Sequence, residues 1–324
     1  MINIDKSQIK ELSYCHFKYL KPLLEKRIET IITNKEITKN DNKIKINSNI
    51  EKCLVYIQNN LKKILLADDA DMKKMIKYFQ INYPCLTTKY EKNKSKAPIY
   101  TIIYNIFISN GYDSYFSENK ENKKYHAYTF VKKLGLKTCP YCNRNFISMI
   151  SKDENGDKQT RPELDHFYPK AIYPFLACTF YNLIPSCKTC NHIKSNDDSY
   201  KDNLVSPYEI EEDSFKFSYT INDIDILKFD NEDDINIVFD KKIDSNEKYF
   251  QLEKLYQEHK DIVIELLIKK DYYPKSYIKE LQSFGFSEDE IYRYLMCNYK
   301  DTKDLHKRPL SKLIKDISEE LKLV

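Results

Sequence analysis

Tryptophan is absent from this 324-residue chain, and glycine occurs only four times. So few glycines argue against a Gly-rich nucleotide-binding scaffold, and they favour helices over a turn-rich all-β fold. No stretch approaches the ~18–20 consecutive apolar residues of a membrane span. The first 14 residues show no basic-then-apolar signal pattern. These absences predict a cytoplasmic protein with no membrane partner.

The charge of the chain permits a polyanionic partner without requiring one. The net charge is +4, and its distribution matters more than its sum. Residues 39–52 and 120–137 are rich in lysine, whereas residues 209–234 are acidic. This asymmetry suits a molecule with one face toward a polyanion. Solvated helix faces and loops explain each stretch equally well when it is taken alone.

The spacing of apolar residues predicts a mainly α fold with a small α+β insertion. In residues 1–135 it predicts helices near 9–31, 50–65, 72–79, 99–109 and 125–134, with Gly135 ending the last one. The polar residues 34–47 are predicted to form a loop. In residues 206–324, strands are expected at 215–221 and 235–239, followed by helices at 250–269, 273–284, 288–297 and 310–321.

Residues 136–205 have a different character from the helical regions on either side. They contain five of the nine cysteines, two histidines, an Asn-Gly turn and several prolines. Residues 146–151 and 160–166 are expected to form a β-hairpin around the turn at 154–157. This region is too short and irregular to build a large core alone, so we expect a small metal-stapled module.

Two Cys-x-x-Cys motifs, Cys139 with Cys142 and Cys187 with Cys190, give the strongest signal in the sequence. Two such turns complete a tetrahedral four-thiolate site that zinc fills without an open position, which makes its role structural. Free thiols, disulfides and a redox motif are the alternatives. Disulfides conflict with the expected cytoplasmic location, and a redox motif normally lies in a thioredoxin-like βαβ context that is missing here.

An ordered set of polar residues lies around these cysteines. The order is Asp165-His166, then Asn182-Leu, then Cys-x-x-Cys followed at once by Asn191-His192, and then Lys194. It resembles the HNH endonuclease family, whose fold is a ββα-metal finger. The resemblance covers residues 137–195, roughly a fifth of the chain, and is specific because five elements coincide in order. It implies that residues 136–205 are an HNH nuclease module.

The chemistry of phosphodiester hydrolysis also fits Asp165 and His166. The reaction needs a base to activate water and a cation to stabilise charge on the phosphate and the leaving oxygen. Histidine has the pKa range of a base, and a carboxylate is a hard oxygen ligand for Mg²⁺. Adjacent residues on a strand point to opposite faces. Both can still flank one site if the strand ends or bends there.

The resemblance assigns roles to two asparagines. Asn191 matches the family's third position and would complete the ligation of Mg²⁺ or Mn²⁺ through its side-chain oxygen. His192 is the alternative ligand, and with it Zn²⁺, Ni²⁺ or Mn²⁺ becomes more plausible. Asn182 matches the middle position, which in relatives orients the loop carrying the base through backbone hydrogen bonds.

These residues predict a metal-dependent endonuclease acting on DNA. The alternatives are a nuclease of RNA such as tRNA, or a zinc-stapled subunit that binds nucleic acid or protein and is active only with a partner. The wider chain resembles HNH proteins of bacterial anti-phage systems, among them the Septu nuclease subunit, which acts with an ATPase. That resemblance implies a role in defence and an ATPase partner.

Overall fold

The computed structural model describes residues 1–39, 42–88, 97–117, 125–150, 160–222, 232–273 and 275–323. Helices predominate in these ranges, and the strands in them form small two-stranded antiparallel sheets. The mainly α class expected from the sequence is therefore confirmed. No helix in these ranges is long and apolar enough to cross a membrane.

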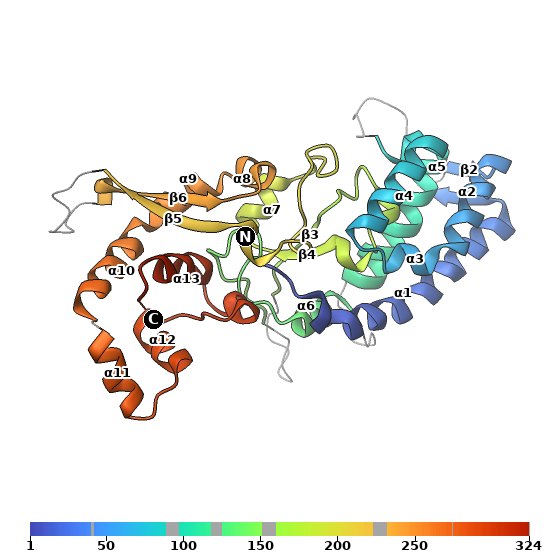
Figure 1. Ribbon diagram of the computed structural model, residues 1–324. Coiled ribbons are helices and arrows are strands. Elements are labelled where there is room, and N and C mark those ends of the chain that lie inside the picture. Colours follow the sequence, from blue (N-terminus) through green and yellow to red (C-terminus); the bar gives the residue numbers. More distant parts are fainter. Residues whose placement is uncertain are drawn as a thin grey trace.

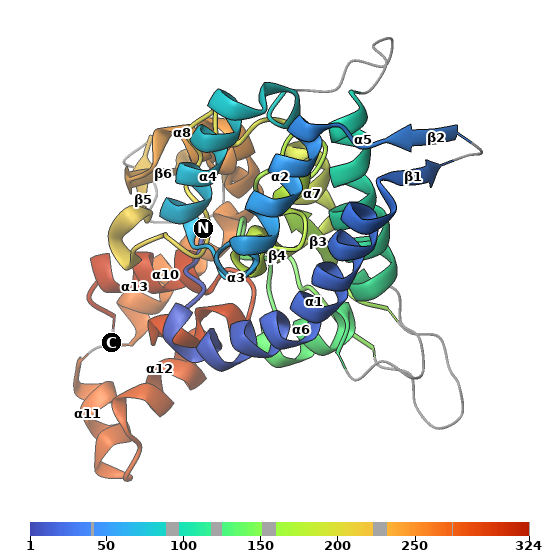
Figure 2. The same ribbon diagram turned by 90° about the vertical axis from the view of Figure 1, so that its right-hand side faces the viewer.

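The N-terminal part of the chain is almost entirely helical (Figure 2). Its elements are α1 (Lys6–Asn34), β1 (Glu36–Lys39), β2 (Asn42–Lys45), α2 (Ser48–Asn59), α3 (Leu61–Leu65), α4 (Asp69–Asn82), η1 (Pro84–Leu86), α5 (Pro98–Tyr104), the π-helix η2 (Asn105–Ser117) and α6 (Ala127–Leu134). Asp5 caps α1 by accepting a hydrogen bond from the backbone N–H of Ser7. Gly135 ends α6 with a positive φ of 73°, as its position in the sequence predicts.

Residues 34–47 do not form the predicted loop. They contain the β1–β2 hairpin, in which Ile37 pairs with Ile44. Ile37 is buried, and Ile44 and Ile46 pack against the core. The alternation of isoleucine with polar residues places one apolar face of the hairpin on the protein. The sequence prediction missed the strands because this alternation is short and lies in a segment rich in Lys and Asn.

The central part of the chain contains β3 (Glu163–His166), η3 (Pro174–Leu176), η4 (Phe180–Asn182), β4 (Leu183–Ser186) and α7 (Lys188–Lys194). The predicted hairpin of residues 146–151 with 160–166 is found in the described residues only as the antiparallel pair Ile150–Thr160, and its second half, residues 163–166, does not pair with residues 146–149. β3 pairs instead with β4, with His166 opposite Leu183. The expected turn at 154–157 lies outside the described residues. β4 is the better partner because Leu183 and Ile184 are fully buried in the core.

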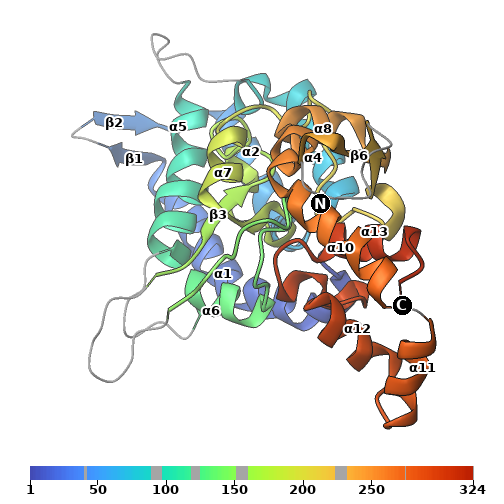
Figure 3. The ribbon, with the colours of Figure 1, turned by 90° about the vertical axis from the view of Figure 1, so that its left-hand side faces the viewer.

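The C-terminal part begins with a two-stranded sheet and continues as helices. Its elements are η5 (Glu212–Ser214), β5 (Lys216–Ile221), η7 (Glu232–Asp234), β6 (Ile235–Lys241), α8 (Asp244–Phe250), α9 (Leu252–Tyr256), η8 (Gln257–His259), α10 (Lys260–Tyr272), α11 (Lys275–Ser283), α12 (Glu288–Met296), η9 (Thr302–Lys307) and α13 (Ser311–Glu320). The helix predicted over residues 250–269 is broken at Gln251, which has a left-handed φ of 49°. Figure 3 shows α11 extending away from the other helices.

Two hydrophobic clusters hold these parts together. One cluster joins the N-terminal helices to the central part, where Phe79 of α4 stacks on Phe175 with ring centroids 4.0 Å apart. The other lies between the β5–β6 sheet, α10 and α13 and includes Phe217 and Leu313. β3, β4 and α7 therefore lie between the helices of the two ends of the chain (Figure 1). The division at residues 135 and 205 stays a prediction.

Candidate functional site

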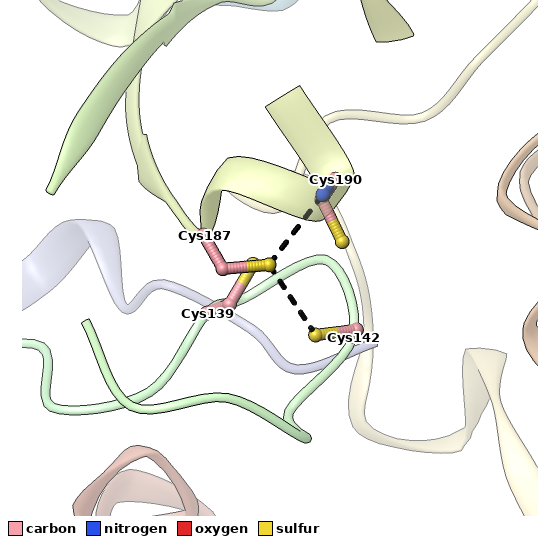
Figure 4. Close-up of side chains that lie close together, drawn as sticks. All are labelled: Cys139, Cys142, Cys187 and Cys190. Atoms are coloured by element: carbon pink, nitrogen blue, oxygen red, sulfur yellow. Dashed lines mark hydrogen bonds between the residues drawn. The ribbon is translucent and has the colours of Figure 1, made fainter. Parts of the chain in front are cut away.

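The four paired cysteines come together in one buried cluster (Figure 4). Cys139 and Cys142 lie in the turn after α6, while Cys187 is the N-cap of α7 and Cys190 lies in its first turn. Their sulfur atoms all lie within 4.8 Å of one another. The sequence prediction of one four-cysteine group is confirmed.

The size and surroundings of the cluster fit a tetrahedral zinc ion. Zn–S bonds of about 2.3 Å separate neighbouring sulfurs by about 3.8 Å, and Cys142 and Cys187 have Sγ atoms 4.0 Å apart. The side-chain N–H of Asn145 and the backbone N–H of Cys190 donate to Cys187 Sγ. Burial raises the pKa of Cys139, whereas the hydrogen bond from Cys139 lowers that of Cys187. A cation would let all four thiols ionise together.

The first cysteine turn is fixed to the C-terminal helices. Asn143, which follows Cys142, is fully buried and has a left-handed φ of 50°. Its Oδ1 accepts the backbone N–H of Lys312 in α13, and its Nδ2 donates to the carbonyl oxygen of Leu305. The hydroxyl of Tyr256 donates to the carbonyl of Cys142 at 2.6 Å. Order at the cluster therefore depends on elements more than 100 residues away in the sequence.

A pocket of about 540 Å³ lies beside β3 and α7, and Asp165, His166, Asn191 and His192 all line it. Strand geometry alone would point Asp165 and His166 to opposite faces. Both residues reach this pocket at the point where β3 ends, since His166 is its last residue. We call this space the β3–α7 pocket.

The His166 ring is held in one tautomer. Its Nε2 lies 3.1 Å from the carbonyl oxygen of Ala177, which can only accept, so Nε2 carries the proton. Burial lowers the pKa of His166 well below its usual range, and the charge of Lys170 acts in the same direction. The ring is therefore neutral, and its Nδ1 holds a lone pair. Tyr112 contacts the ring edge-on, with centroids 4.4 Å apart.

Two donors hold the carboxylate of Asp165. The hydroxyl of Tyr141 donates to Oδ2 at 2.6 Å, and Nζ of Lys194 lies 3.2 Å from Oδ1. Lys194 is fully buried and also donates to the carbonyl of His166 at 2.8 Å. Tyr141 stands between the two cysteines of the first motif. Tyr141 thus connects the first cysteine turn to Asp165 through a single side chain.

Asn182 lies outside the lining of the β3–α7 pocket and orders the chain that follows His166. Its Oδ1 accepts the backbone N–H of Tyr168, and its Nδ2 donates to the carbonyls of Tyr168 and Leu176. The carbonyl next to Leu176 belongs to Ala177, the partner of His166. One buried amide therefore braces both ends of the loop around the His166 ring.

Helix α7 serves both groups of residues. Cys190 is buried in the cysteine cluster, while the next two residues, Asn191 and His192, line the β3–α7 pocket. Both remain candidates for the third ligand of a catalytic metal. In the described part of the chain, the cysteines make up the only cluster of three or more His, Cys, Asp or Glu ligands. One carboxylate and one amide oxygen suit Mg²⁺, which usually keeps several of its waters.

Sequence reasoning missed the wall of the pocket formed by η2. Tyr112, Asp113 and Ser117 of this π-helix line the pocket, although they lie about 50 residues before the HNH-like motif. A Cβ at Gly111 would lie 2.8 Å from Sγ of Cys178, so η2 packs tightly on the central part. π-Helices are rare and often occur at functional sites. Nothing in the local sequence indicates this contact.

Comparison with known proteins gives one short similarity. A segment of 45 residues is 47% identical to the Septu protein PtuB of Bacillus thuringiensis. The segment covers 14% of this chain and 18% of that protein. No family model matches the chain, and no solved structure matches it. The similarity links a short part of this chain to a Septu protein.

Proposed function

We propose that this protein is a metal-dependent endonuclease of the HNH type that hydrolyses phosphodiester bonds of DNA. The observation that carries the proposal is the β3–α7 pocket, where a neutral histidine lies with Asp165 and Asn191. These residues also follow the HNH-like order in the sequence. A protein that only binds nucleic acid needs neither a base nor a ligand set for a hard cation.

In this proposal His166 is the general base. Its Nδ1 takes a proton from water as the water oxygen attacks phosphorus, and the bond from phosphorus to the leaving oxygen breaks. The leaving oxygen takes a proton from a second water molecule. The resemblance to the HNH family implies 5′-phosphate and 3′-hydroxyl products. The carbonyl of Ala177 keeps the ring oriented and stabilises the imidazolium that forms.

The remaining residues hold charge in position. Asp165 and Asn191 would bind Mg²⁺ or Mn²⁺, which stabilises negative charge on the phosphate and the leaving oxygen. Tyr141 and Lys194 keep the Asp165 carboxylate in one orientation. Asn182 orients the loop around His166. Zinc at the four cysteines would fix α7 against the first cysteine turn and so keep these groups in register.

A role in bacterial anti-phage defence, with an ATPase partner, is the biological setting that we propose. It is supported by the 45-residue similarity to the Septu protein PtuB and by the resemblance of the wider sequence to HNH proteins of such systems. An enzyme of this kind can be weakly active until its partner binds, so the partner belongs in the test of function.

The decisive test is cleavage of supercoiled plasmid with Mg²⁺ or Mn²⁺ by wild type and by His166→Ala. We expect nicking or linearisation by wild type and a rate ~10²–10⁴-fold lower for the variant, with unchanged zinc content and melting temperature. His126→Ala, a half-buried histidine outside the pocket lining, is the matched control and should cleave like wild type.

Three other results have a definite meaning. Equal cleavage by wild type and His166→Ala would contradict the assignment of the base. Cleavage of RNA but not DNA would change the proposed substrate from DNA to RNA and leave the proposed mechanism unchanged. No cleavage of either polymer, with or without a cognate ATPase, would contradict the nuclease proposal and favour a binding subunit.

A further inference from the structure

Two cations that are not among the ordered polar residues of the HNH-like motif line the same pocket as His166. Arg161 comes just before β3, and Lys170 follows its end by four residues. Both line the β3–α7 pocket. Each also contacts η2, the helix that lines the pocket with Tyr112, Asp113 and Ser117 and lies about 50 residues away in the sequence.

Arg161 is held in place and still has free donor capacity. Its Nη2 donates to Ser117 Oγ of η2 at 3.0 Å, and its Nη1 donates to the carbonyl of Pro162. Its guanidinium lies 5.8 Å from the ring centroid of Tyr128. A guanidinium has five N–H donors, so about three have no hydrogen-bond partner among the residues that the structure describes. Within the described ranges, no carboxylate oxygen lies within 4 Å of Arg161.

Lys170 is positioned by the same helix but is held weakly. Its Nζ lies 3.4 Å from Asp113 and 4.5 Å from the centroid of the Tyr112 ring. Half of the Asp113 side chain is exposed, and ion pairs this open contribute little to stability. A phosphate oxygen entering the pocket can therefore replace Asp113 as the partner of Lys170.

The charges in the pocket show why both cations matter. Asp113 and Glu163 also line it, and their carboxylates repel a polyanion. Arg161 and Lys170 offset these two charges, while Lys194 already pairs with Asp165. Removal of either Arg161 or Lys170 leaves an excess of negative charge in the pocket, where the phosphodiester backbone of a nucleic acid would have to bind.

We propose that Arg161 and Lys170 form a two-cation clamp, oriented by η2, that binds the phosphodiester backbone of the nucleic acid at two points beside His166. The proposal rests on the nuclease function proposed above and assigns substrate binding to two residues that lie within the HNH-like stretch but are not among its ordered polar residues. Arg161 contributes a fork of N–H donors that matches two phosphate oxygens, and Lys170 contributes a mobile point charge. Ser117 is a positioning residue because it acts through Arg161.

The test is binding of a fluorescein-labelled DNA duplex, measured by anisotropy over a range of NaCl concentrations, in a His166→Ala background that prevents cleavage. Each phosphate contact that is lost should lower the slope of log K against log salt by about 0.9. We expect Arg161→Gln and Lys170→Gln each to lower affinity several-fold and to lower this slope by about one contact. Arg161→Lys should keep the slope and lose part of the affinity.

Matched controls separate the clamp from general charge and from folding. Arg293 of α12 lies over the ring of Tyr299, and Lys201 is an exposed lysine paired with Asp198. Neither residue lines the pocket. Arg293→Gln and Lys201→Gln should leave affinity and slope unchanged. Ser117→Ala should give a smaller loss of affinity than Arg161→Gln. Melting curves of all variants check the fold.

The outcomes distinguish the clamp from the nuclease proposal. If wild type cleaves DNA but Arg161→Gln and Lys170→Gln keep the wild-type affinity and slope, the clamp is wrong and the nuclease proposal stands. If the pocket variants and the control variants lower the slope of log K against log salt by the same amount, the effect comes from net charge alone and the clamp is wrong. If wild type neither binds nor cleaves nucleic acid, both proposals fail.

Discussion

The cysteine cluster and the β3–α7 pocket share helix α7 yet differ in almost every physical property. The cluster consists of four identical ligand atoms within 4.8 Å of one another, all on buried residues. The pocket is an open space of about 540 Å³ lined by carboxylate, amide, imidazole and cationic groups. Cys190 and Asn191 are neighbours in the sequence and belong to different sites. Adjacent positions can therefore serve stability and chemistry separately.

The comparison shows how the buried cysteine cluster can fix the positions of side chains in the open β3–α7 pocket. Tyr141 extends from the first cysteine turn to Asp165, and Lys194 reaches the same carboxylate from the end of α7. A zinc ion in the cluster would fix both of these elements without touching substrate. Variants at the two sites should therefore differ in kind, one set changing the fold and the other changing only catalysis.

The largest effect is expected from Cys187→Ser. Loss of one thiolate from a buried site couples the loss of metal to local unfolding, so zinc content, melting temperature and activity should fall together, with roughly 4 kcal/mol or more lost from the free energy of unfolding. Elemental analysis and thermal melts measure this. Cys15→Ser, at an exposed thiol, is the control. A variant with full zinc content would rule out the four-thiolate site.

The next effect sharpens the comparison within α7 itself. Asn191→Ala should lower the cleavage rate ~10²–10³-fold, as expected for loss of a group that stabilises the transition state, and should leave zinc content and melting temperature unchanged. His192→Ala should have a much smaller effect. Rates over a titration of Mn²⁺ measure both. The reverse ranking would identify His192 as the metal ligand and would favour a softer ion.

A third prediction concerns a residue that belongs to neither site. His16 is fully buried, and burial lowers its pKa to about 4 from an ordinary value of 6.5. The folded pKa lies below the unfolded one, so the unfolded chain binds the extra proton as pH falls below 6.5. The contribution of His16 to the free energy of unfolding is therefore present at pH 7 and is lost as the pH falls toward 4. About 2 kcal/mol of the free energy of unfolding is lost by pH 5.

Urea unfolding at pH 7 and pH 5 tests this contribution. His16→Gln keeps a donor for the carbonyl of Cys178 and should reduce the change in free energy between the two pH values by about 2 kcal/mol. Zinc content should stay the same in both proteins. An unchanged difference between the two pH values would mean that His16 does not contribute to the pH dependence of stability.

The smallest effect is expected from Tyr141→Phe, which removes one of the two contacts that connect the sites. It removes only the 2.6 Å hydrogen bond to Asp165, while Lys194 still holds the carboxylate. A hydrogen bond to a charged group contributes about 1.5–3 kcal/mol. Because Lys194 still holds the carboxylate, we expect the low end of this range, which is roughly tenfold slower cleavage, with full zinc content. Loss of zinc from this variant would mean that the two sites cannot be separated.

Several features could be predicted from sequence because they depend on neighbours along the chain. The spacing of Cys139, Cys142, Cys187 and Cys190 predicted one cluster, and the structure confirms it. Helical periodicity predicted a mainly α fold, and Gly135 marked the end of α6. The β1–β2 hairpin was missed because its period-2 pattern is short and lies among Lys and Asn residues.

The sequence by itself determined which residues can bind zinc and which residues form a histidine–carboxylate–amide set, because side-chain chemistry and spacing are local properties. The tertiary structure alone decided that β3 pairs with β4, that η2 forms a wall of the pocket, and that Lys194 pairs with Asp165. These contacts join residues about 20 to 50 positions apart in the chain. They depend on the sum of many small packing terms, which no single sequence pattern records.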